Sequence, residues 1–210
     1  MNDDELADDE NGMSGAEWPV DLTGVTESVV TTLGPNGRWN AAALGLFEGD
    51  PVTATTWGNT RTRRNFHRQG EGYVQFVDDP VTFAEAACSI HESDEPVLES
   101  AAAWTRVSVE RTDRGTDDGT DWESWALEPL ESTVERRVVP TIDRGFGAVV
   151  EATVAASRLG VDSYDQNRLR VHLEYCASVV DRAGDERDRA ALEVVSEHSP
   201  WDPSDSRFDS

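Results

Sequence analysis

The hydrophobic pattern of this 210-residue chain changes its period near Pro140. Before Pro140, short runs of β-branched and aromatic residues are separated by turn residues, which is typical of antiparallel strands. After Pro140, a run that starts with Gly145, Ala148, Val149 and Ala152 has i, i+3, i+4, i+7 spacing, which indicates an amphipathic helix. The pattern therefore predicts a fold that is mainly β with α, in which a β-rich region precedes an all-helical region.

Six strands are expected before Pro140. They cover residues 25–33, 38–47, 52–57, 73–77, 104–111 and 122–127. The Asn36-Gly37 pair between the first two strands is a strong hairpin signal. The short helices and the polar loop expected in the same region cover residues 59–69, 82–89 and 112–120. Asn59 or Thr60 is the expected N-cap of the first helix. Six strands with few helices is the count of a small closed or split barrel.

The remaining helices are expected at residues 145–159, 169–180 and 185–197. The ends of the chain are polar: the first residues are mostly Asp, Glu, Asn and Gly, and Pro200 and Pro203 stop any helix near the last residues. The expected organisation is therefore a disordered acidic tail, a β domain, a helical domain and a loose tail, with bounds at 1–17, 18–130, 131–198 and 199–210.

The charge is strongly negative and is spread along the chain. There are 42 Asp and Glu residues against 18 basic residues, all of them Arg, for a net charge of -24. Binding of nucleic acid or anionic lipid is not expected, because both need a basic surface. An acidic surface repels itself in dilute solution and is tolerated where salt screens it. The composition, which lacks Lys altogether, resembles that of haloarchaeal cytoplasmic proteins.

No stretch approaches the roughly 18 apolar residues of a membrane span. The N-terminus is acidic and lacks the basic and then apolar order of a signal peptide. The two cysteines, Cys88 and Cys176, are far apart and form no CxxC motif. These features predict a reduced, cytoplasmic protein without a membrane partner.

Motifs of several enzyme classes are missing from the sequence. There is no Walker A, GxGxxG, GxSxG or HExxH motif, and the four histidines are scattered without the spacing of metal ligands. Cys88 and Cys176 lie in apolar helical contexts, so we expect buried small hydrophobes rather than nucleophiles. A hydrolase has little support, and no catalytic acid or base can be nominated.

The densest group of cations lies between Thr60 and Asn65, where the third strand passes into a helix. A helix N-terminus offers free N–H groups and a partial positive charge, and Arg adds bidentate bonds, so this segment suits a phosphate. The alternative is a solvated helix surface that pairs with nearby acid. The neighbouring strand contains Ala41, Ala42, Ala43 and Gly45, whose small size allows something large to approach the backbone. The two features together suit a phosphorylated planar ligand.

A family resemblance agrees with this interpretation. Residues 27–80 read ESVVTTLGPNGRWNAAALGLFEGDPVTATTWGNTRTRRNFHRQGEGYVQFVDDP, and this stretch resembles the flavin reductase-like FMN-binding split barrels. With FAEAA after it and ESTVERRVVPTIDRGFGAVVEATVAASR at 131–158, the chain looks like a member of the archaeal domain of unknown function 447 family. The resemblance covers about residues 18–198. It implies a six-stranded FMN-binding split β-barrel followed by an all-helical C-terminal region, and a homodimer with FMN near its interface.

The resemblance also implies site residues. The strand after the first hairpin places Asn40, Ala41 and Ala42 at the flavin ring. The residues implied at the ribityl phosphate come from the third strand and the next helix: Thr55, Thr56, Thr62 and Asn65, with Arg61 or Arg63 adding charge. Such barrels often carry an Asn near the flavin on the strand at 73–77, and this chain has Gln75 there.

A second group of cations, Arg136, Arg137 and Arg144, could reach the phosphate, an anionic substrate or a partner subunit. A set of surface salt bridges is the alternative for these residues. The leading hypothesis for the whole chain is an FMN-binding flavoprotein that acts as a flavin-dependent oxidoreductase. A flavin-binding module without turnover, and a barrel that serves only in assembly, are the alternatives.

Overall fold

The computed structural model describes residues 16–203. Most of the tail expected at 1–17, and the last part of the tail expected at 199–210, therefore lie outside the described residues. The chain begins with a hairpin of β1 (Val25–Leu33) and β2 (Trp39–Phe47), which pair along their whole length from Val25 opposite Phe47 to Leu33 opposite Trp39. Gly37 takes a φ of 77° in the connecting turn. The Asn-Gly hairpin prediction is therefore confirmed.

The strands form a closed antiparallel barrel. Its further members are β3 (Val52–Trp57), β4 (Glu71–Val77), β6 (Ala101–Asp117) and β7 (Thr120–Val134). The order is β1-β4-β6-β7-β3-β2, and the β1–β2 pairing closes the ring. The barrel interior is filled by apolar side chains from every wall, including Val30, Leu46, Val74, Val107 and Leu127. The predicted six-stranded barrel is confirmed.

One short strand was not expected from the sequence. β5 (His91–Ser93) pairs with Trp39–Ala41 on the edge of β2 that faces away from β1. Three residues are too few to show a period, so the sequence carries no strand signal there. This strand matters because it brings Glu92 beside β2.

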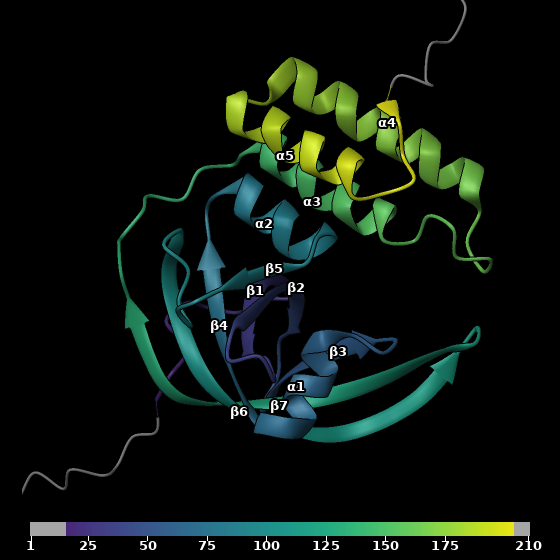
Figure 1. Ribbon diagram of the computed structural model, residues 1–210. Coiled ribbons are helices and arrows are strands. Elements are labelled where there is room, and N and C mark those ends of the chain that lie inside the picture. The colour runs from purple at the N-terminus through teal and green to yellow at the C-terminus, as the bar shows by residue number, and fades with distance from the viewer. Residues whose placement is uncertain (1–15, 204–210) are drawn as a thin grey trace, which may run out of the picture.

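The prediction of a polar loop at 112–120 is wrong. β6 and β7 continue through it as a two-stranded arm, which turns at Asp118 and Gly119 with φ values of 45° and 81°. Two successive residues with positive φ are the signature of a tight hairpin turn. The arm extends from the barrel in Figure 1. Its residues are mostly exposed on both faces, so the alternation of apolar and polar residues that marks a half-buried strand is missing.

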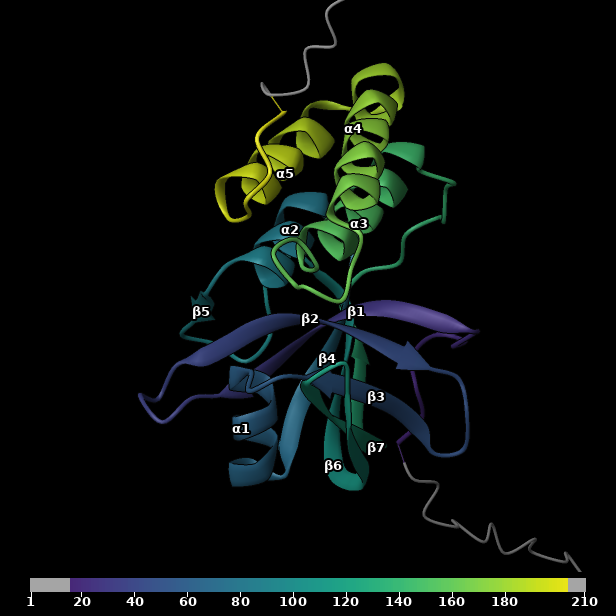
Figure 2. The same cartoon turned by 90° about the vertical axis from the view of Figure 1, so that its right-hand side faces the viewer.

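The helices expected after Pro140 are confirmed: α3 (Arg144–Ala156), α4 (Gln166–Ala183) and α5 (Glu186–Glu197). They form a layer above the barrel together with α2 (Pro80–Cys88), which precedes them by more than fifty residues in the sequence (Figures 1 and 2). Ala84 of α2 is buried in the same apolar cluster as Val149, Leu173 and Val195 of the three later helices. The helical layer is therefore built from both parts of the chain.

Two details differ from the expected bounds. β7 runs to Val134, past the expected domain boundary at 130. Trp201, which was expected in a loose tail, is 4% exposed and belongs to the apolar cluster of the helical layer. An indole ring is large enough to hold an otherwise polar segment against a helix surface. None of the helices at residues 16–203 is long and apolar enough to span a membrane.

The remaining helix, α1 (Arg61–Gln69), leans on the barrel wall beside β1, β2 and β4. Thr60 is its N-cap and accepts a hydrogen bond from the backbone N–H of Arg63, and Gly70 ends it with a φ of 67°. Phe66 is 1% exposed and packs edge-on against Trp125, with ring centroids 5.2 Å apart. The edge-to-face contact and the burial hold α1 against the barrel.

The first turn of α3 needs a glycine. A Cβ on Gly145 would lie 2.0 Å from Oδ2 of Asp188 and 2.7 Å from Cα of Gly184, so α3 and the start of α5 approach each other there without room for a side chain. A Cβ on Gly147 in the next turn would meet nothing within 4 Å. The two glycines therefore have different roles in one helix.

We expect Gly145→Ala to lower the free energy of unfolding by about 1–3 kcal/mol, because the added methyl group forces α3 and α5 apart. The matched change Gly147→Ala should raise it by about 0.5–1 kcal/mol, because Ala favours the helix. Denaturant titrations of both variants in molar KCl measure this difference. If Gly145→Ala is as stable as Gly147→Ala, the close approach of α3 and α5 is wrong.

Candidate functional site

The barrel is split between β2 and β3. On the edge that faces away from β1, β2 pairs with β5 at residues 39–41 and with β3 only at Leu46 and Phe47. Among the described strands none pairs with this edge at Ala42–Gly45, and the end of β3, from Thr55 to Trp57, pairs only with β7. Small side chains therefore border an opening in which one edge of the β2 backbone has no strand beside it.

The predicted ring residues lie on both faces of β2. Ala42 packs against the barrel core, whereas Ala41 is 2% exposed and packs under the helical layer with Phe83 and Ala86. Asn40 is 6% exposed and lies at the start of β2, where α1 comes close. Neighbouring residues of a strand point to opposite faces. A ligand on one face of β2 can therefore contact the side chain of Ala41 or that of Ala42, but not both.

The two predicted threonines of β3 also differ. Thr56 points into the barrel, is 5% exposed, and its Oγ1 accepts a hydrogen bond of 2.9 Å from Nε1 of Trp125. Thr55 is half-buried and points outward, beside the split. Of the two, Thr55 is the one whose side chain can reach a bound molecule.

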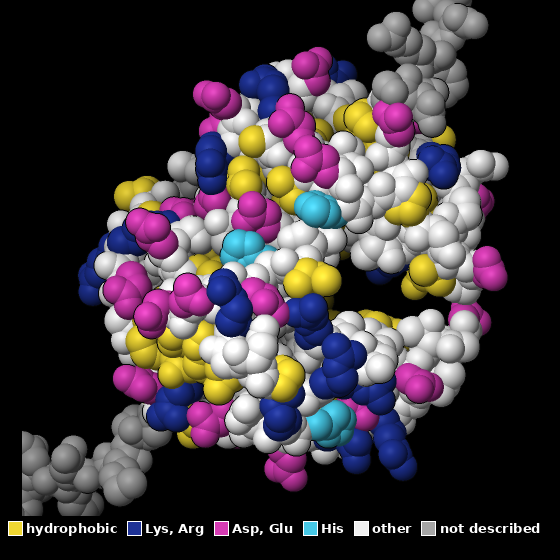
Figure 3. Space-filling view, in the orientation of Figure 1, with side chains coloured by type: hydrophobic (Ala, Val, Ile, Leu, Met, Phe, Trp, Pro, Cys, Tyr) yellow, Lys and Arg dark blue, Asp and Glu magenta, His cyan; other side chains and the backbone are white. Residues whose placement is uncertain are grey.

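A polar cavity of about 420 Å³ lies between α1 and the β1–β2 turn. It is lined by Gly34, Pro35, Asn36, Asn40, Arg61, Arg64, Asn65, Arg68 and Glu92. Three of the predicted site residues, Asn40, Arg61 and Asn65, meet here. Three guanidinium groups face one carboxylate, so the cavity is positive in a chain whose net charge is -24. Figure 3 shows the Arg side chains gathered over α1 on this face.

The arginines of α1 separate onto two sides of the helix. Arg61, Arg64 and Arg68 are spaced three and four residues apart, which puts them on one side, toward the cavity. Their present partners leave donors free: Arg61 bonds Glu92, Nη1 of Arg64 bonds the Asn59 carbonyl at 2.7 Å, and Nη2 of Arg68 donates to Asn65 Oδ1 at 2.8 Å. A guanidinium has five N–H donors, so each can still bind an anion.

The buried polar residues of α1 attach it to β1. Asn65 is 3% exposed, and its Nδ2 donates to Oγ1 of Thr32 at 2.9 Å. Thr62, the other predicted helix residue, is 4% exposed and faces the barrel one turn earlier. Asn65 therefore orients Arg68 through its Oδ1 and lines the cavity with the remaining amide surface.

Arg63 lies on the other side of α1 and does not line the cavity. Its Nε and Nη2 bind Glu123 at 2.9 Å and 3.0 Å, and Nε2 of His67 lies 2.7 Å from the same carboxylate. Nη1 of Arg111 completes the cluster at 3.1 Å. Glu123 is 2% exposed. Burial alone would raise the pKa of Glu123, but the hydrogen bonds from Arg63, His67 and Arg111 outweigh it and lower the pKa below its ordinary value.

Glu123 was not singled out from the sequence. It alternates with Trp125 and Leu127, which are both buried, so a carboxylate at that position faces inward. A charged residue in register with the core of a strand is the signal that could have found it, because such a group needs a partner.

Gln75 is placed away from the cavity. It is fully buried, and its Nε2 donates to Oγ1 of Thr31 and to the carbonyl of Pro96, both at 3.0 Å. Its Oε1 accepts from the backbone N–H of Leu98 at 2.7 Å. Gln75 thus holds the segment between β5 and β6 against the barrel, and the structure gives it no free polar group for a ligand.

The second group of predicted cations is dispersed. Arg136, Arg137 and Arg144 are all exposed, and Arg136 forms a surface salt bridge with Asp78 and also binds the carbonyl of Ser100. Both cysteines are free. Cys176 is buried, as predicted, whereas Cys88 is only partly buried, and burial raises the pKa of each thiol to about 11. Within residues 16–203 no group of three metal-ligating side chains comes together.

The Glu123 cluster generates a test of pH and stability. A carboxyl with a lowered pKa stabilises the fold above its unfolded pKa, near 4.3, and this contribution is lost as the pH falls through the folded pKa. We expect Glu123→Gln to cost about 3 kcal/mol at pH 7, because it leaves Arg63 without its charged partner. The cost should shrink below pH 4.

The matched control is Glu131→Gln, since Glu131 is exposed and its ion pair within residues 16–203 is a long one, with Arg106 at 3.6 Å. This change should have an effect under about 1 kcal/mol at both pH values. Thermal unfolding at pH 7 and pH 3.5 measures both variants. If Glu123→Gln and Glu131→Gln lower the free energy of unfolding equally at pH 7, Glu123 does not hold α1.

Two family models match the chain. The N-terminal domain of the protein of unknown function DUF447 matches residues 26–136, and a second DUF447 model matches residues 143–197. No curated protein matches. The split between the models falls in the connection between the barrel and α3, which agrees with the two parts of the fold.

Similar solved structures extend this finding. The FMN-bound protein of family DUF447 from Methanosarcina mazei is 23% identical with a TM-score of 0.70, and the match covers 84% of this chain and 96% of that chain. The flavin reductase of the styrene monooxygenase from Pseudomonas putida S12 is 15% identical with a TM-score of 0.39, covering 54% and 82%. A flavin reductase domain protein from Arthrobacter sp. FB24 is 11% identical with a TM-score of 0.39, covering 55% and 80%.

The first of these likenesses shows that the barrel and the helical layer occur together in another protein. The family models span most of the chain on their own. The chain therefore belongs to the DUF447 family of proteins of unknown function.

Proposed function

We propose that this protein binds FMN, with the phosphate in the cavity lined by Arg61, Arg64 and Arg68 and the flavin ring in the split between β2 and β3. The observation that carries the proposal is the convergence of three guanidinium groups on one polar cavity in a chain of charge -24. The FMN-bound member of the same family, which shares the fold, supports it.

The chemistry of the cavity suits a phosphate ester. Arg61 is the first residue of α1, so its side chain starts at the helix end that carries a partial positive charge. Arg64 and Arg68 add donors from the next turns, and Asn40 adds a neutral polar group from β2. Glu92 holds Arg61 in place and leaves an excess of positive charge for a dianion. Thr62 and Arg63 lie on the sides of α1 that face away from the cavity, and they fix the position of the helix.

The split suits the ring. Ala42, Ala43 and Gly45 leave the backbone of β2 open to a flat molecule, and the edge from Ala42 to Gly45 has N–H and C=O groups that no described strand uses. Thr55 borders the same opening from β3. Figure 2 shows α1 below the start of β2, on the side where β3 ends, so that one molecule can span the split and the cavity.

We further propose that the protein is an oxidoreductase. Bound FMN would supply the hydride or single-electron chemistry. The residues of the chain would bind the phosphate, orient the ring along β2 and keep water from one ring face. Reduction of protein-bound flavin by NAD(P)H, followed by its absorbance, separates this function from a flavin-binding module without turnover.

We also propose a homodimer that functions in a salt-rich cytoplasm. The segment between β7 and α3 exposes apolar side chains that the monomer does not cover: Ile142 is fully exposed and Val139 is 88% exposed. Apolar side chains exposed together mark an interaction surface. A second copy seated on this segment would cover them.

The informative test of the phosphate site compares FMN with riboflavin, which has the same ring and no phosphate. The Arg61→Gln/Arg64→Gln double variant should weaken FMN binding about ten- to a hundredfold, because charge-assisted bonds to the phosphate are lost. Riboflavin binding should change little. Fluorescence titration measures both ligands.

The control for this test is Arg170→Gln/Arg182→Gln, which removes the same charge from exposed positions on α4. It should leave both affinities unchanged. Thr55→Leu should weaken both ligands, because the larger side chain obstructs the opening that Thr55 borders. The phosphate assignment is wrong if the α1 variant binds FMN as tightly as the parent, or loses both ligands equally.

The dimer has its own test. Light scattering in molar KCl should give about twice the chain mass of 23.1 kDa. Val139→Asp/Ile142→Asp should shift the protein to the mass of one chain, because two charges are placed in the interface. Ile90→Asp changes a residue that is 70% exposed outside this segment and should leave the mass unchanged. A parent protein that stays monomeric with FMN bound would contradict the proposal.

A further inference from the structure

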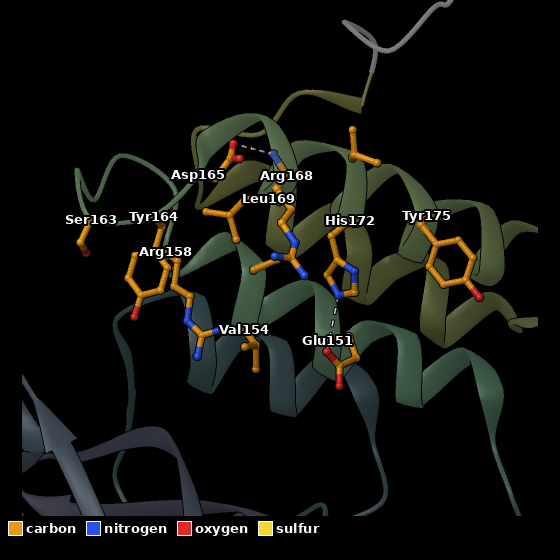
Figure 4. A pocket seen from close by; sticks show the side chains of 12 residues that line it. Glu151, Val154, Arg158, Ser163, Tyr164, Asp165, Arg168, Leu169, His172 and Tyr175 are labelled. Carbon is orange, nitrogen blue, oxygen red and sulfur yellow. Dashed lines mark hydrogen bonds and ion pairs between the residues drawn. The ribbon is translucent and has the colours of Figure 1, made fainter.

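The helical layer contains a second and larger cavity. It has a volume of about 700 Å³ and lies in the groove between α3 and α4, closed at one end by the loop at 163–165 (Figure 4). A volume in this range is typical of sites for small molecules. The cavity shares no lining residue with the one beside α1.

The walls of this groove are largely apolar. Val154 and Ala155 of α3 face Leu169 and Val171 of α4 across it. Tyr164 and Tyr175 stand at opposite ends in Figure 4. Val171 and Tyr175 are both 60% exposed, although each could be covered by a molecule that lies in the groove. Such walls bind an aliphatic or aromatic body through the area removed from water.

Two cations line the same walls. The guanidinium of Arg158 lies over the ring of Tyr164, 5.3 Å from its centroid, and Arg168 extends into the groove from the first turn of α4. Neither guanidinium pairs with a carboxylate of residues 16–203. Two acids also line the groove. Glu151 is 3.5 Å from Nε2 of His172 and lies away from Tyr164, and Asp165 is engaged as the N-cap of α4, where its Oδ1 accepts from the backbone N–H groups of Asn167 and Arg168.

The two arginines of the groove lie beside aromatic and apolar side chains, where an anion is attracted more strongly than in open water. Arg158 is also held against Tyr164, so less freedom is lost when it binds.

We propose that the groove between α3 and α4 binds an organic anion, a carboxylate, sulfonate or phosphate carried on an aromatic or aliphatic body. Arg158 and Arg168 bind the acidic group, and the body lies along Val154, Leu169 and Val171. The cavity beside α1 differs in kind, because it is lined by polar and charged groups and suits a phosphate without an apolar body around it. The groove is therefore a separate site, which shares no lining residue with the cavity beside α1.

The probe for the test is 8-anilinonaphthalene-1-sulfonate, an aromatic sulfonate whose fluorescence rises on binding. Its neutral analogue N-phenyl-1-naphthylamine has the same rings without the sulfonate. We expect the parent protein to bind one sulfonate probe saturably. Arg158→Gln/Arg168→Gln should weaken that binding about tenfold or more and should change the affinity for the neutral analogue less than about threefold.

The matched control is again Arg170→Gln/Arg182→Gln, which should change neither affinity. A near-ultraviolet circular dichroism spectrum like that of the parent shows that each variant is folded. The single change Arg168→Gln, at an exposed position, gives a second variant for the same test if the double variant does not fold. Val171→Glu should weaken both probes, because it puts a charge on the apolar wall.

Three outcomes would overturn the proposal. One is a lack of saturable binding by the parent, and another is equal affinity of the parent and the Arg158→Gln/Arg168→Gln variant for the sulfonate. The third is an affinity that falls as the protein concentration rises, which would mean that a second copy of the chain occupies the groove. Loss of sulfonate binding in Arg61→Gln/Arg64→Gln would place the probe in the other cavity and would also contradict the proposal.

Discussion

The pairing of β2 with β1 along nine residues is the constraint on which the rest of the structure depends. It closes the barrel, since the other four barrel strands form a series of antiparallel neighbours whose two ends pair with β1 and β2. Because one edge of β2 is fully used by β1, only the other edge remains for β3 and β5, and these two reach opposite ends of it. The opening left between them begins at Ala42, two residues after Asn40, which lines the cavity beside α1. The pairing of β2 with β1 therefore fixes both the closure of the barrel and the position of this opening.

The position of α1 depends on a second interaction, that of buried Glu123 with Arg63 and His67. The Glu123 carboxylate on β7 binds one side of the helix. On another side, Asn65 donates a hydrogen bond to Thr32 of β1. With both sides held, the helix cannot rotate, and Arg61, Arg64 and Arg68 are left facing the cavity. A buried charge with several partners thus orients neighbouring charges that remain free for a ligand.

Much of this was predictable from particular residues. The Asn36-Gly37 turn, the N-cap Thr60 and the helical spacing after Pro140 are local signals, and all three elements have the expected place. The density of Arg around Thr60–Asn65 led to the prediction of an anion site, which stays a prediction. Of the residues predicted for it or for the ring, Asn40, Arg61 and Asn65 line one cavity. The role of Arg63 could not be predicted, because its partner Glu123 is sixty residues away in the sequence. The number of charged residues in a helix also does not show on which side each side chain lies. Gln75 was expected near the ligand by analogy, whereas its hydrogen-bond partners are Thr31 of β1 and two backbone groups of a segment without regular structure.

By itself the sequence determined the types and order of the elements, because hydrophobic period, turn residues and helix caps act within a few residues of the chain. It also determined the acidic surface, which is a matter of composition. Only the tertiary structure decided that α2 joins the later helices, that β6 and β7 extend as an arm, and that α3 and α4 leave a groove lined by Arg158 and Arg168. These features depend on contacts between distant segments. Such contacts form where whole surfaces fit together, which no local pattern specifies.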